Sequence, residues 1–296
     1  MREKRRTEGR NPASRGLDRM SAAAILRVMN REDAKVARAV GREIPAIARA
    51  VDAIVKSLRG GGRLFYAGAG TSGRLAVLDA AECPPTFGIS PKLVQALIAG
   101  GKRAITGAVE GAEDDAAAGA RELKRRKLGA RDVVVGIAAS GGTPFVLGAI
   151  AYAKKRGAAT VAVTANRNSP LARAARICIV PETGPEVIAG STRLKAGTAQ
   201  KLVLNMLSTA ALVRLGHVYD NWMIDVALTN RKLRARGVRI LAEAGSCKTP
   251  AAEKALRLCG NELRAALVLL KRGGTPAEAR GRLRRAGGNL RRALGE

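Results

Sequence analysis

The chain has 296 residues, of which 47% are hydrophobic and only 2% aromatic, and its 53 lysines and arginines against 24 aspartates and glutamates give a formal net charge of +29. This length allows one large α/β domain with a small appendage, and aliphatic residues must build most of its core. The 4 cysteines show no C-x-x-C spacing, which argues against a disulfide framework or a zinc site and favours a reducing cytoplasm.

The high positive charge has two interpretations. It would attract a nucleic acid or another anionic surface. Alternatively, it reflects an arginine-rich surface, which also attracts phosphorylated substrates. Basic clusters lie at residues 2–6, 124–127, 231–239 and 280–292. No aromatic residues alternate with them, as base-stacking platforms would need, so we favour the second interpretation and expect no nucleic-acid partner.

Hydropathy predicts neither a secretion signal nor a membrane span. Residues 1–6 are charged, with no apolar run behind them. The longest apolar tract, residues 202–215, is short and contains Asn205 and Arg214. We therefore expect a cytoplasmic protein with no membrane partner.

An N-terminal helical segment is predicted over residues 1–59, after a polar and irregular start. Ser21 is placed to cap a helix that runs to Met29. A second helical pattern covers residues 32–58, with an interruption near Pro45.

Strand and helix patterns alternate across residues 60–240. Continuous apolar runs predict strands at residues 64–67, 93–99, 132–138, 160–164 and 177–180. Helical patterns cover residues 73–81, 114–126, 144–156, a short stretch from Pro170, and 199–216. Such an alternation indicates an α/β fold, a three-layer αβα sandwich in which helices cover both faces of a parallel sheet. Ligands of these sheets bind at the carboxyl ends of the strands.

A smaller, all-helical module is predicted at residues 241–296. Its helical patterns cover residues 249–258, 261–270 and 275–286, with glycine or asparagine at the joints. Such short helices suit a compact module or an appendage that stabilises a dimer.

The first predicted strand leads into a turn rich in glycine and hydroxyl groups, with Thr71 and Ser72 at the start of the next helix. Backbone N–H groups and hydroxyls at such a point can hold an anion. The letters match the dinucleotide pattern G-x-G-x-x-G, but no acidic residue stands in the ribose position. A tight turn without a ligand is the alternative. Pro84 and Pro85 are predicted to end this helix directly after Glu82, a candidate acid or base.

Two further segments share this composition. The third strand ends in Ser140-Gly141-Gly142-Thr143, followed by Pro144 in the first turn of a helix. Two hydroxyl-bearing turns on neighbouring strand ends indicate an anion site more strongly than one. After the last strand, Ser191, Arg193 and Lys195 stand near the start of the long helix, where a solvated loop is the alternative.

Acidic residues cluster at 110–115, at the start of a helix. Most of them would be ordinary helix caps, but one could project into the same cleft as Glu82. His217 is the only histidine, which argues against a Ser-His-Asp triad or a histidine metal site.

Five segments of this chain together resemble the N-acetylmuramic acid 6-phosphate etherases, which belong to the sugar isomerase (SIS) superfamily. The segments are Ala67–Arg74, Glu82–Gly88, Glu110–Asp115, Gly136–Gly141 and Gly190–Lys201. The resemblance runs from Thr7 through the C-terminal helices. Gly142 departs from it, because the family pattern has arginine there, and this change would weaken a contact to phosphate or carboxylate.

The resemblance implies a reaction. The substrate is a 6-phosphosugar with a D-lactyl ether at C3. In the open-chain form C1 is an aldehyde, so removal of the C2 proton expels lactate, and water then adds at C3. Two glutamates with separated pKa values can supply the base and the acid, and the reaction needs no metal, flavin or nicotinamide.

The resemblance also implies roles for single residues. Glu82 would protonate the departing lactate and Glu113 would remove the C2 proton, or the two roles would be exchanged. Phosphate and sugar oxygens would be held by Thr71, Ser72, Ser140, Gly141, Thr143 and Ser191, with Arg193 and Lys195 as charge partners. The resemblance further implies a homodimer that acts on a phosphorylated amino sugar from the cell wall.

Three other functions are compatible with the sequence. A non-catalytic sensor of sugar phosphates, as in the related glucokinase regulatory protein, would use the same fold, although the presence of both Glu82 and Glu113 favours an enzyme. A phosphosugar isomerase also begins by removing a proton beside a carbonyl. A nucleic-acid-binding regulator is suggested only by the charge.

Overall fold

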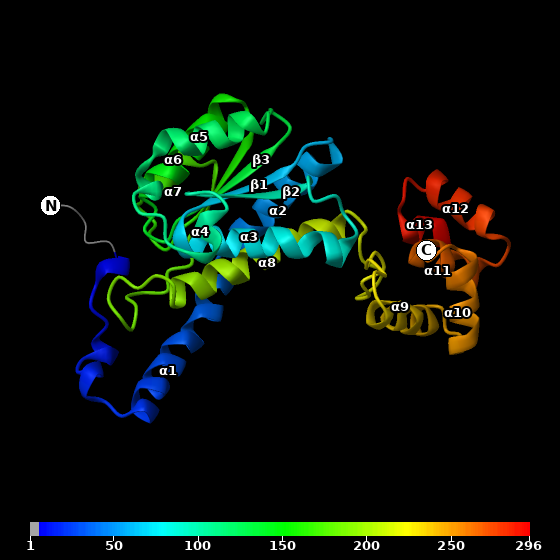
Figure 1. Cartoon of the computed structure of the whole chain (residues 1–296), viewed down its shortest axis with the longest axis horizontal. Coiled ribbons are helices and arrows are strands. Elements are labelled where there is room, and N and C mark those ends of the chain that lie inside the picture. The colour runs from blue at the N-terminus through cyan, green and yellow to red at the C-terminus, as the bar shows by residue number, and fades with distance from the viewer. Residues whose placement is uncertain (1–5) are drawn as a thin grey trace. The chain divides into compact units, whose positions relative to one another are not determined.

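The computed structural model describes residues 6–296, so the basic cluster predicted at residues 2–6 lies almost entirely outside it. The described chain forms two compact units (Figure 1). The first comprises the residues up to Ala81 together with Pro91–Ala211, and the second comprises Glu82–Ser90 together with Leu212–Glu296. The predicted boundary at residue 240 lies inside helix α9 (Arg231–Ala244).

A five-stranded parallel sheet forms the centre of the first unit. Its strands follow the order β2-β1-β3-β4-β5. Their bounds are β1 Leu64–Gly68, β2 Val94–Ile98, β3 Val133–Ile137, β4 Ala159–Val163 and β5 Ile177–Ile179. All pairings are parallel, and Ala67 of β1 is in register with Leu97 and with Gly136. The five predicted strands and their parallel arrangement are therefore confirmed.

Three helices cover one face of this sheet: α5 (Ala116–Arg125), α6 (Pro144–Lys155) and α7 (Pro170–Ala174) (Figure 1). Helix α6 packs on β1, β3 and β4, and α5 packs on α6. The two helices approach so closely that a Cβ at Gly148 would lie 1.9 Å from the Ala116 carbonyl oxygen. Phe65, Val134 and Phe145 are buried between the sheet and these helices.

The opposite face carries α2 (Ile44–Arg59), α3 (Gly70–Phe87) and α8 (Lys195–Arg214). The buried carboxylate of Asp79 on α3 holds this layer together. It accepts hydrogen bonds from the Tyr66 hydroxyl at 2.9 Å, from the Asn205 amide at 2.8 Å and from the Ser208 hydroxyl at 3.1 Å. These bonds join β1, α3 and α8, and the two helical layers confirm the predicted αβα sandwich.

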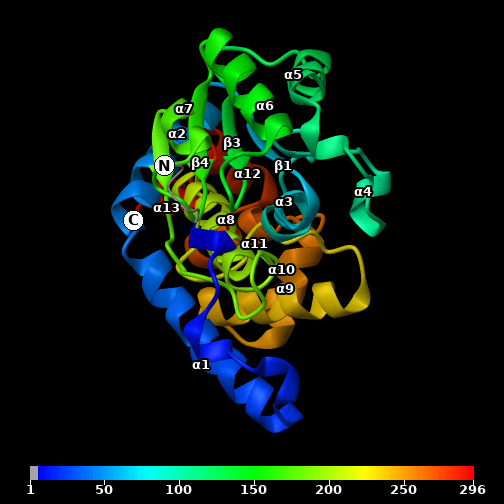
Figure 2. The same cartoon turned by 90° about the vertical axis from the view of Figure 1, so that its left-hand side faces the viewer.

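Helix α1 (Ala22–Gly41) departs from the prediction, because it continues through the break expected after Met29. Val28, Glu32 and Val36 recur at intervals of four residues and are all buried, so one continuous face of the helix is used. The Ser21 hydroxyl accepts a hydrogen bond from the Ala24 N–H at 3.4 Å, which confirms the predicted cap. In both views α1 extends away from the sheet (Figure 2).

The predicted end of α3 at Pro84 and Pro85 is wrong, because the helix continues through both prolines to Phe87. Proline lacks an N–H and removes helical hydrogen bonds, but its fixed φ angle is helical. Gly88 directly follows the last helical residue, and its φ of +62° suits a glycine after the last turn. The Gly88 N–H donates to the Pro84 carbonyl oxygen at 2.9 Å.

The second unit has a helical core of its own. Its helices are α9 (Arg231–Ala244), α10 (Thr249–Leu258), α11 (Leu263–Arg272), α12 (Pro276–Arg285) and α13 (Leu290–Leu294). Leu241, Leu256 and Leu267 are buried together. The three predicted helices correspond to α10, α11 and α12, whereas α9 and α13 were not predicted. The side chain of His217 forms a hydrogen bond with the carboxylate of Asp225, with 2.7 Å between Nδ1 and Oδ2.

None of the described helices is long and apolar enough to span a bilayer.

Candidate active site

The turn after β1 is built on glycines that bring the strand and helix α3 into close contact. A Cβ at Gly68 would lie 2.7 Å from the Gly73 nitrogen, and a Cβ at Gly73 would lie 2.9 Å from the Gly68 carbonyl oxygen. Only glycine fits at both positions. The turn places Ser72, which is buried, and Thr71, which is half-buried, in the first turn of α3.

The turn after β3 lies beside it, because β1 and β3 are neighbours in the sheet. Gly141 has a φ of +68°, and a Cβ there would lie 2.2 Å from the Ser169 hydroxyl. The Ser140 hydroxyl accepts a hydrogen bond from the Gly142 N–H at 3.2 Å and keeps its own proton for donation. Thr143 precedes α6 but its side chain makes no capping bond. Two hydroxyl-bearing turns thus lie side by side at the carboxyl ends of the strands.

The start of α8 packs against the turns after β1 and β3. Ala196 is buried with Ala139 and Ala165, which follow β3 and β4. A Cβ at Gly197 would lie 3.5 Å from the Thr71 methyl carbon. The third predicted segment, Gly190–Lys201, therefore lies at the carboxyl ends of the strands, together with the turns after β1 and β3.

Gln200 was not singled out from the sequence, although it lies within the quoted segment Gly190–Lys201. The Ser72 hydroxyl donates to its side-chain oxygen at 2.9 Å. Gln200 is buried, and its side-chain nitrogen has no hydrogen-bond partner among the described residues. This bond uses the only proton of the Ser72 hydroxyl, so Ser72 would have to turn from Gln200 to donate to a phosphate.

The N-terminus of α8 is already occupied by a carboxylate of the protein itself. Glu186 is fully buried and accepts hydrogen bonds from the Lys195 N–H at 3.0 Å and the Ala196 N–H at 2.9 Å. These bonds use the N–H groups that would otherwise attract an anion. Ser191 is half-buried and Arg193 is exposed, so their side chains remain accessible.

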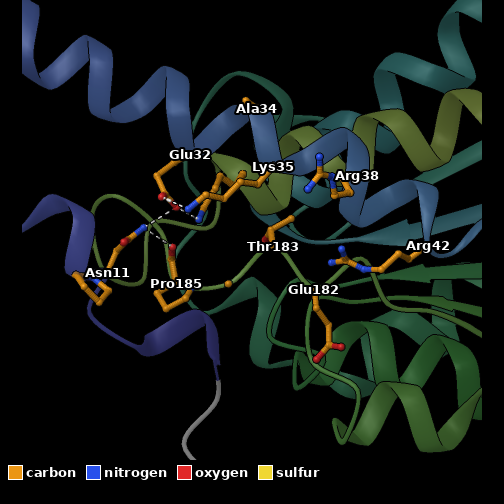
Figure 3. A pocket seen from close by; sticks show the side chains of 12 residues that line it. Asn11, Glu32, Ala34, Lys35, Arg38, Arg42, Glu182, Thr183 and Pro185 are labelled. Carbon is orange, nitrogen blue, oxygen red and sulfur yellow. Dashed lines mark hydrogen bonds and ion pairs between the residues drawn. The ribbon is translucent and has the colours of Figure 1, made fainter.

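Lys195 also has a carboxylate partner. Its ammonium is buried and donates to Glu32 of α1 at 2.6 Å. Glu32 further accepts from the Asn11 amide at 2.8 Å and from the Lys35 ammonium (Figure 3). Burial raises the pKa of Glu32, but the hydrogen bonds from Lys195, Lys35 and Asn11 outweigh it and lower the pKa from 4.5 to about 2. Lys195 retains two further N–H donors for a ligand.

The two glutamates with predicted catalytic roles lie in different compact units, Glu113 in the first and Glu82 in the second. Glu82 is exposed in the last part of α3. Glu113 is exposed in a 3-10 turn, η4 (Ala112–Asp114), which packs against α6. Asp115, not Glu113, caps helix α5 by accepting a hydrogen bond from Ala118 at 2.9 Å. Glu113 is therefore not needed as a helix cap.

Arg74 anchors the loop that leads to Glu113. Its guanidinium donates to the carbonyl oxygens of Ile105 at 3.1 Å and Gly107 at 2.7 Å. Because this loop follows β2, Arg74 holds it at the carboxyl end of the sheet, beside the start of α3. Among residues 6–296, no group of three or more His, Cys, Asp or Glu side chains is placed to bind a metal ion.

Comparisons with known proteins place this architecture. Residues 46–154 match the model of the glucokinase regulatory protein N-terminal SIS domain, and residues 108–210 match the SIS domain. A protein from E. coli CFT073, solved in complex with a ligand, shares the fold, with a TM-score of 0.50 and 17% identity, and the match covers 68% of this chain and 97% of that one.

Two curated relatives are much more similar. An N-acetylmuramic acid 6-phosphate etherase from Aeromonas hydrophila is 54% identical over 282 residues, which is 95% of each chain. One from Yersinia pestis is 52% identical over 288 residues, which is 97% of this chain and 98% of that one. At this identity and coverage, the chain belongs to the N-acetylmuramic acid 6-phosphate etherase family.

Proposed function

We propose that this protein is a lyase that cleaves the D-lactyl ether of N-acetylmuramic acid 6-phosphate and yields N-acetylglucosamine 6-phosphate and D-lactate. The proposal is supported by membership of the family and by one structural observation. The hydroxyl-bearing turns after β1 and β3 lie side by side, and the start of α8 packs against both. Hydroxyls and backbone N–H groups so arranged suit the phosphate and the sugar oxygens.

The phosphate would bind at the first turn of α3 rather than at α8. Glu186 already takes the N–H groups of α8, whereas the backbone N–H groups of Gly70, Thr71 and Ser72 in the first turn of α3 have no hydrogen-bond acceptor among the described residues. Phosphate and sugar oxygens would be held by Thr71, Ser72, Ser140, Gly141, Thr143 and Ser191. Arg193 would supply positive charge, and Lys195 would do so through the two donors that Glu32 does not use.

The elimination would begin on the open-chain aldehyde. One carboxylate takes the C2 proton, a C2–C3 double bond forms, and the C3–O bond breaks. The other carboxyl group protonates the departing lactate oxygen. Water then adds its oxygen to C3 and a proton returns to C2. We assign the base to Glu113 and the acid to Glu82, and a carboxyl group serves either role because it can both accept and donate a proton.

We also propose that the protein acts in the cytoplasm as a homodimer. Leu26 of α1 is 64% exposed, and a second copy of the chain would cover such an apolar side chain. Light scattering on the purified protein tests the assembly, and a monomer at micromolar concentration would contradict it.

The activity is tested by the release of D-lactate from N-acetylmuramic acid 6-phosphate, measured with and without a chelator. We expect release by the natural protein in both cases. Glu82→Gln and Glu113→Gln should each lower kcat by about 10²–10⁴-fold, as expected for the loss of one general acid or base. Binding of the substrate without release of lactate would instead identify a sugar-phosphate sensor.

Deuterium exchange at C2 separates the two glutamates. Glu113→Ala should abolish exchange of the C2 proton with solvent, because no base remains to remove it. Glu82→Ala should retain exchange while lactate release falls. Normal exchange in the Glu113→Ala protein would remove Glu113 from the role of base.

A further inference from the structure

A cavity of about 640 Å³ lies between helix α1 and the loop that follows β5 (Figure 3). Its walls come from the C-terminal half of α1, from residues 182–185, and from Asn11 and Pro12. Lys195 also lines it. All these residues belong to the first compact unit.

The lining is cationic. Lys35, Arg38 and Arg42 are spaced by three and four residues, so they lie on one face of α1. Together with Lys195 they give four positive side chains, against the carboxylates of Glu32 and Glu182. An occupant with two negative charges would neutralise this excess.

The anionic residues of the cavity already have partners. Glu32 accepts hydrogen bonds from Lys195, Lys35 and Asn11. Glu182 forms an ion pair with Arg167 at 3.6 Å. In contrast, the guanidinium groups of Arg38 and Arg42 form no ion pair or hydrogen bond within residues 6–296. The positive charge of these two side chains is therefore available to a ligand.

Thr183 provides an independent indication. Its side chain lines the cavity and is only 6% exposed, yet its hydroxyl has no hydrogen-bond partner in the described part of the chain. Buried hydroxyls are almost always paired, because an unpaired one loses its bonds to water without replacement. An oxygen of a ligand bound between Thr183 and the α1 arginines would complete the pairing.

We propose that this cavity binds a small phosphate monoester. Guanidinium groups form paired hydrogen bonds to phosphate oxygens, an ammonium adds a point charge, and a hydroxyl completes the set. A phosphate monoester carries close to two negative charges at neutral pH, which matches the charge of the lining. The cavity also leaves room for an organic group.

Apart from Lys195, which lines this cavity and is also a charge partner in the candidate active site, the two sites share no residue. The loop at residues 182–185 follows β5, at the edge of the sheet, whereas Ser72 follows β1. Two strands separate β5 from β1, so the loops start about 14 Å apart at the usual strand spacing. The proposal does not depend on the proposed function, because Arg38, Arg42 and Thr183 take no part in it.

Equilibrium dialysis with inorganic phosphate and with glucose 6-phosphate tests the proposal. We expect two sites per chain in the natural protein. Arg38→Gln/Arg42→Gln should weaken one of them by about tenfold or more, since it removes both guanidinium groups. The control, Arg27→Gln/Arg31→Gln, removes the same charge from the same helix outside this cavity and should bind as the natural protein does.

Two further variants separate the sites. Thr183→Val should weaken the same site several-fold and raise the melting temperature, because it removes an unpaired buried hydroxyl. Ser72→Ala should leave this site intact while it weakens binding at the candidate active site. Unchanged phosphate binding in Arg38→Gln/Arg42→Gln would overturn the proposal. Equal losses in both double arginine variants would also overturn it, since net charge alone would then explain the binding.

Discussion

Helices α3 and α8 both begin in segments rich in glycine and hydroxyl groups, yet the N–H groups at their N-termini differ in their hydrogen-bond acceptors. The first turn of α8 gives two backbone N–H groups to the buried carboxylate of Glu186. Its first residue, Lys195, gives its ammonium to Glu32. In the first turn of α3, the backbone N–H groups of Gly70, Thr71 and Ser72 have no acceptor within residues 6–296. Similar composition therefore yields one helix start that the protein satisfies by itself and one that remains open to an anionic ligand.

Of the changes that test the closed start of α8, Glu32→Gln is expected to lower the free energy of unfolding most. The change leaves the buried ammonium of Lys195 without a charged partner, which should lower the free energy of unfolding by about 3–5 kcal/mol. Urea denaturation measures it. Lys35→Met removes the other, 62% exposed ammonium on Glu32 and should cost under about 1 kcal/mol. Similar losses in both variants would show that burial of Lys195 is unimportant.

The contribution of the Glu32 carboxylate should also make the free energy of unfolding depend on pH. The folded pKa of Glu32 is about 2, below the ordinary value of 4.5. Its contribution is therefore fully present above pH 4.5 and is lost as the pH falls towards 2. The difference corresponds to about 3 kcal/mol. Unfolding free energies measured between pH 6 and 2 should show this loss in the natural protein, and Glu32→Gln should lack it. Parallel curves for the two proteins would contradict the assignment.

Glu186→Ala tests the closed N-terminus of α8 directly. The change leaves the N–H groups of Lys195 and Ala196 buried without an acceptor, which should destabilise the fold by about 2 kcal/mol. Thermal and urea unfolding measure the effect. Glu182→Ala, in the same loop, is the matched control, because that side chain is 28% exposed and its ion pair with Arg167 is long, at 3.6 Å. If both variants lose equal stability, the capping role of Glu186 is wrong.

Ser72→Ala tests the open N-terminus of α3, with the smallest effect on stability. Loss of the hydrogen bond to Gln200 should cost about 1 kcal/mol, while KM should rise by about tenfold because a phosphate contact is lost. Ser208→Ala removes a buried hydroxyl bonded to Asp79 and should leave KM unchanged. An unchanged KM in Ser72→Ala would remove Ser72 from phosphate binding.

Local patterns were sufficient for the sheet and for most helices. The five strands are continuous apolar runs because both faces of the sheet are buried, and such runs are visible without tertiary information. The Ser21 cap is also local, since its partner Ala24 is three residues away. The prolines at 84 and 85 misled the prediction because local rules treat proline as a helix breaker, whereas α3 continues through both to Phe87.

The partners of the charged side chains could not be predicted in the same way. Lys195 and Glu32 are separated by 163 positions, and Ser72 and Gln200 by 128. From the sequence, Lys195 is a cation near a helix start and a suitable partner for a substrate. Its pairing with α1 depends on how the N-terminal helix packs, which no pattern near residue 195 encodes.

The sequence by itself determined the αβα fold, the two glycine turns at the ends of β1 and β3, and the family, because these depend on local periodicity and on contiguous motifs. Tertiary structure decided which helix start stays open to an anion. The acceptors that close α8 come from Glu186 and Glu32, and only folding brings these carboxylates within hydrogen-bond distance. A hydrogen bond acts over about 3 Å, so positions far apart along the chain become partners only through the packed core.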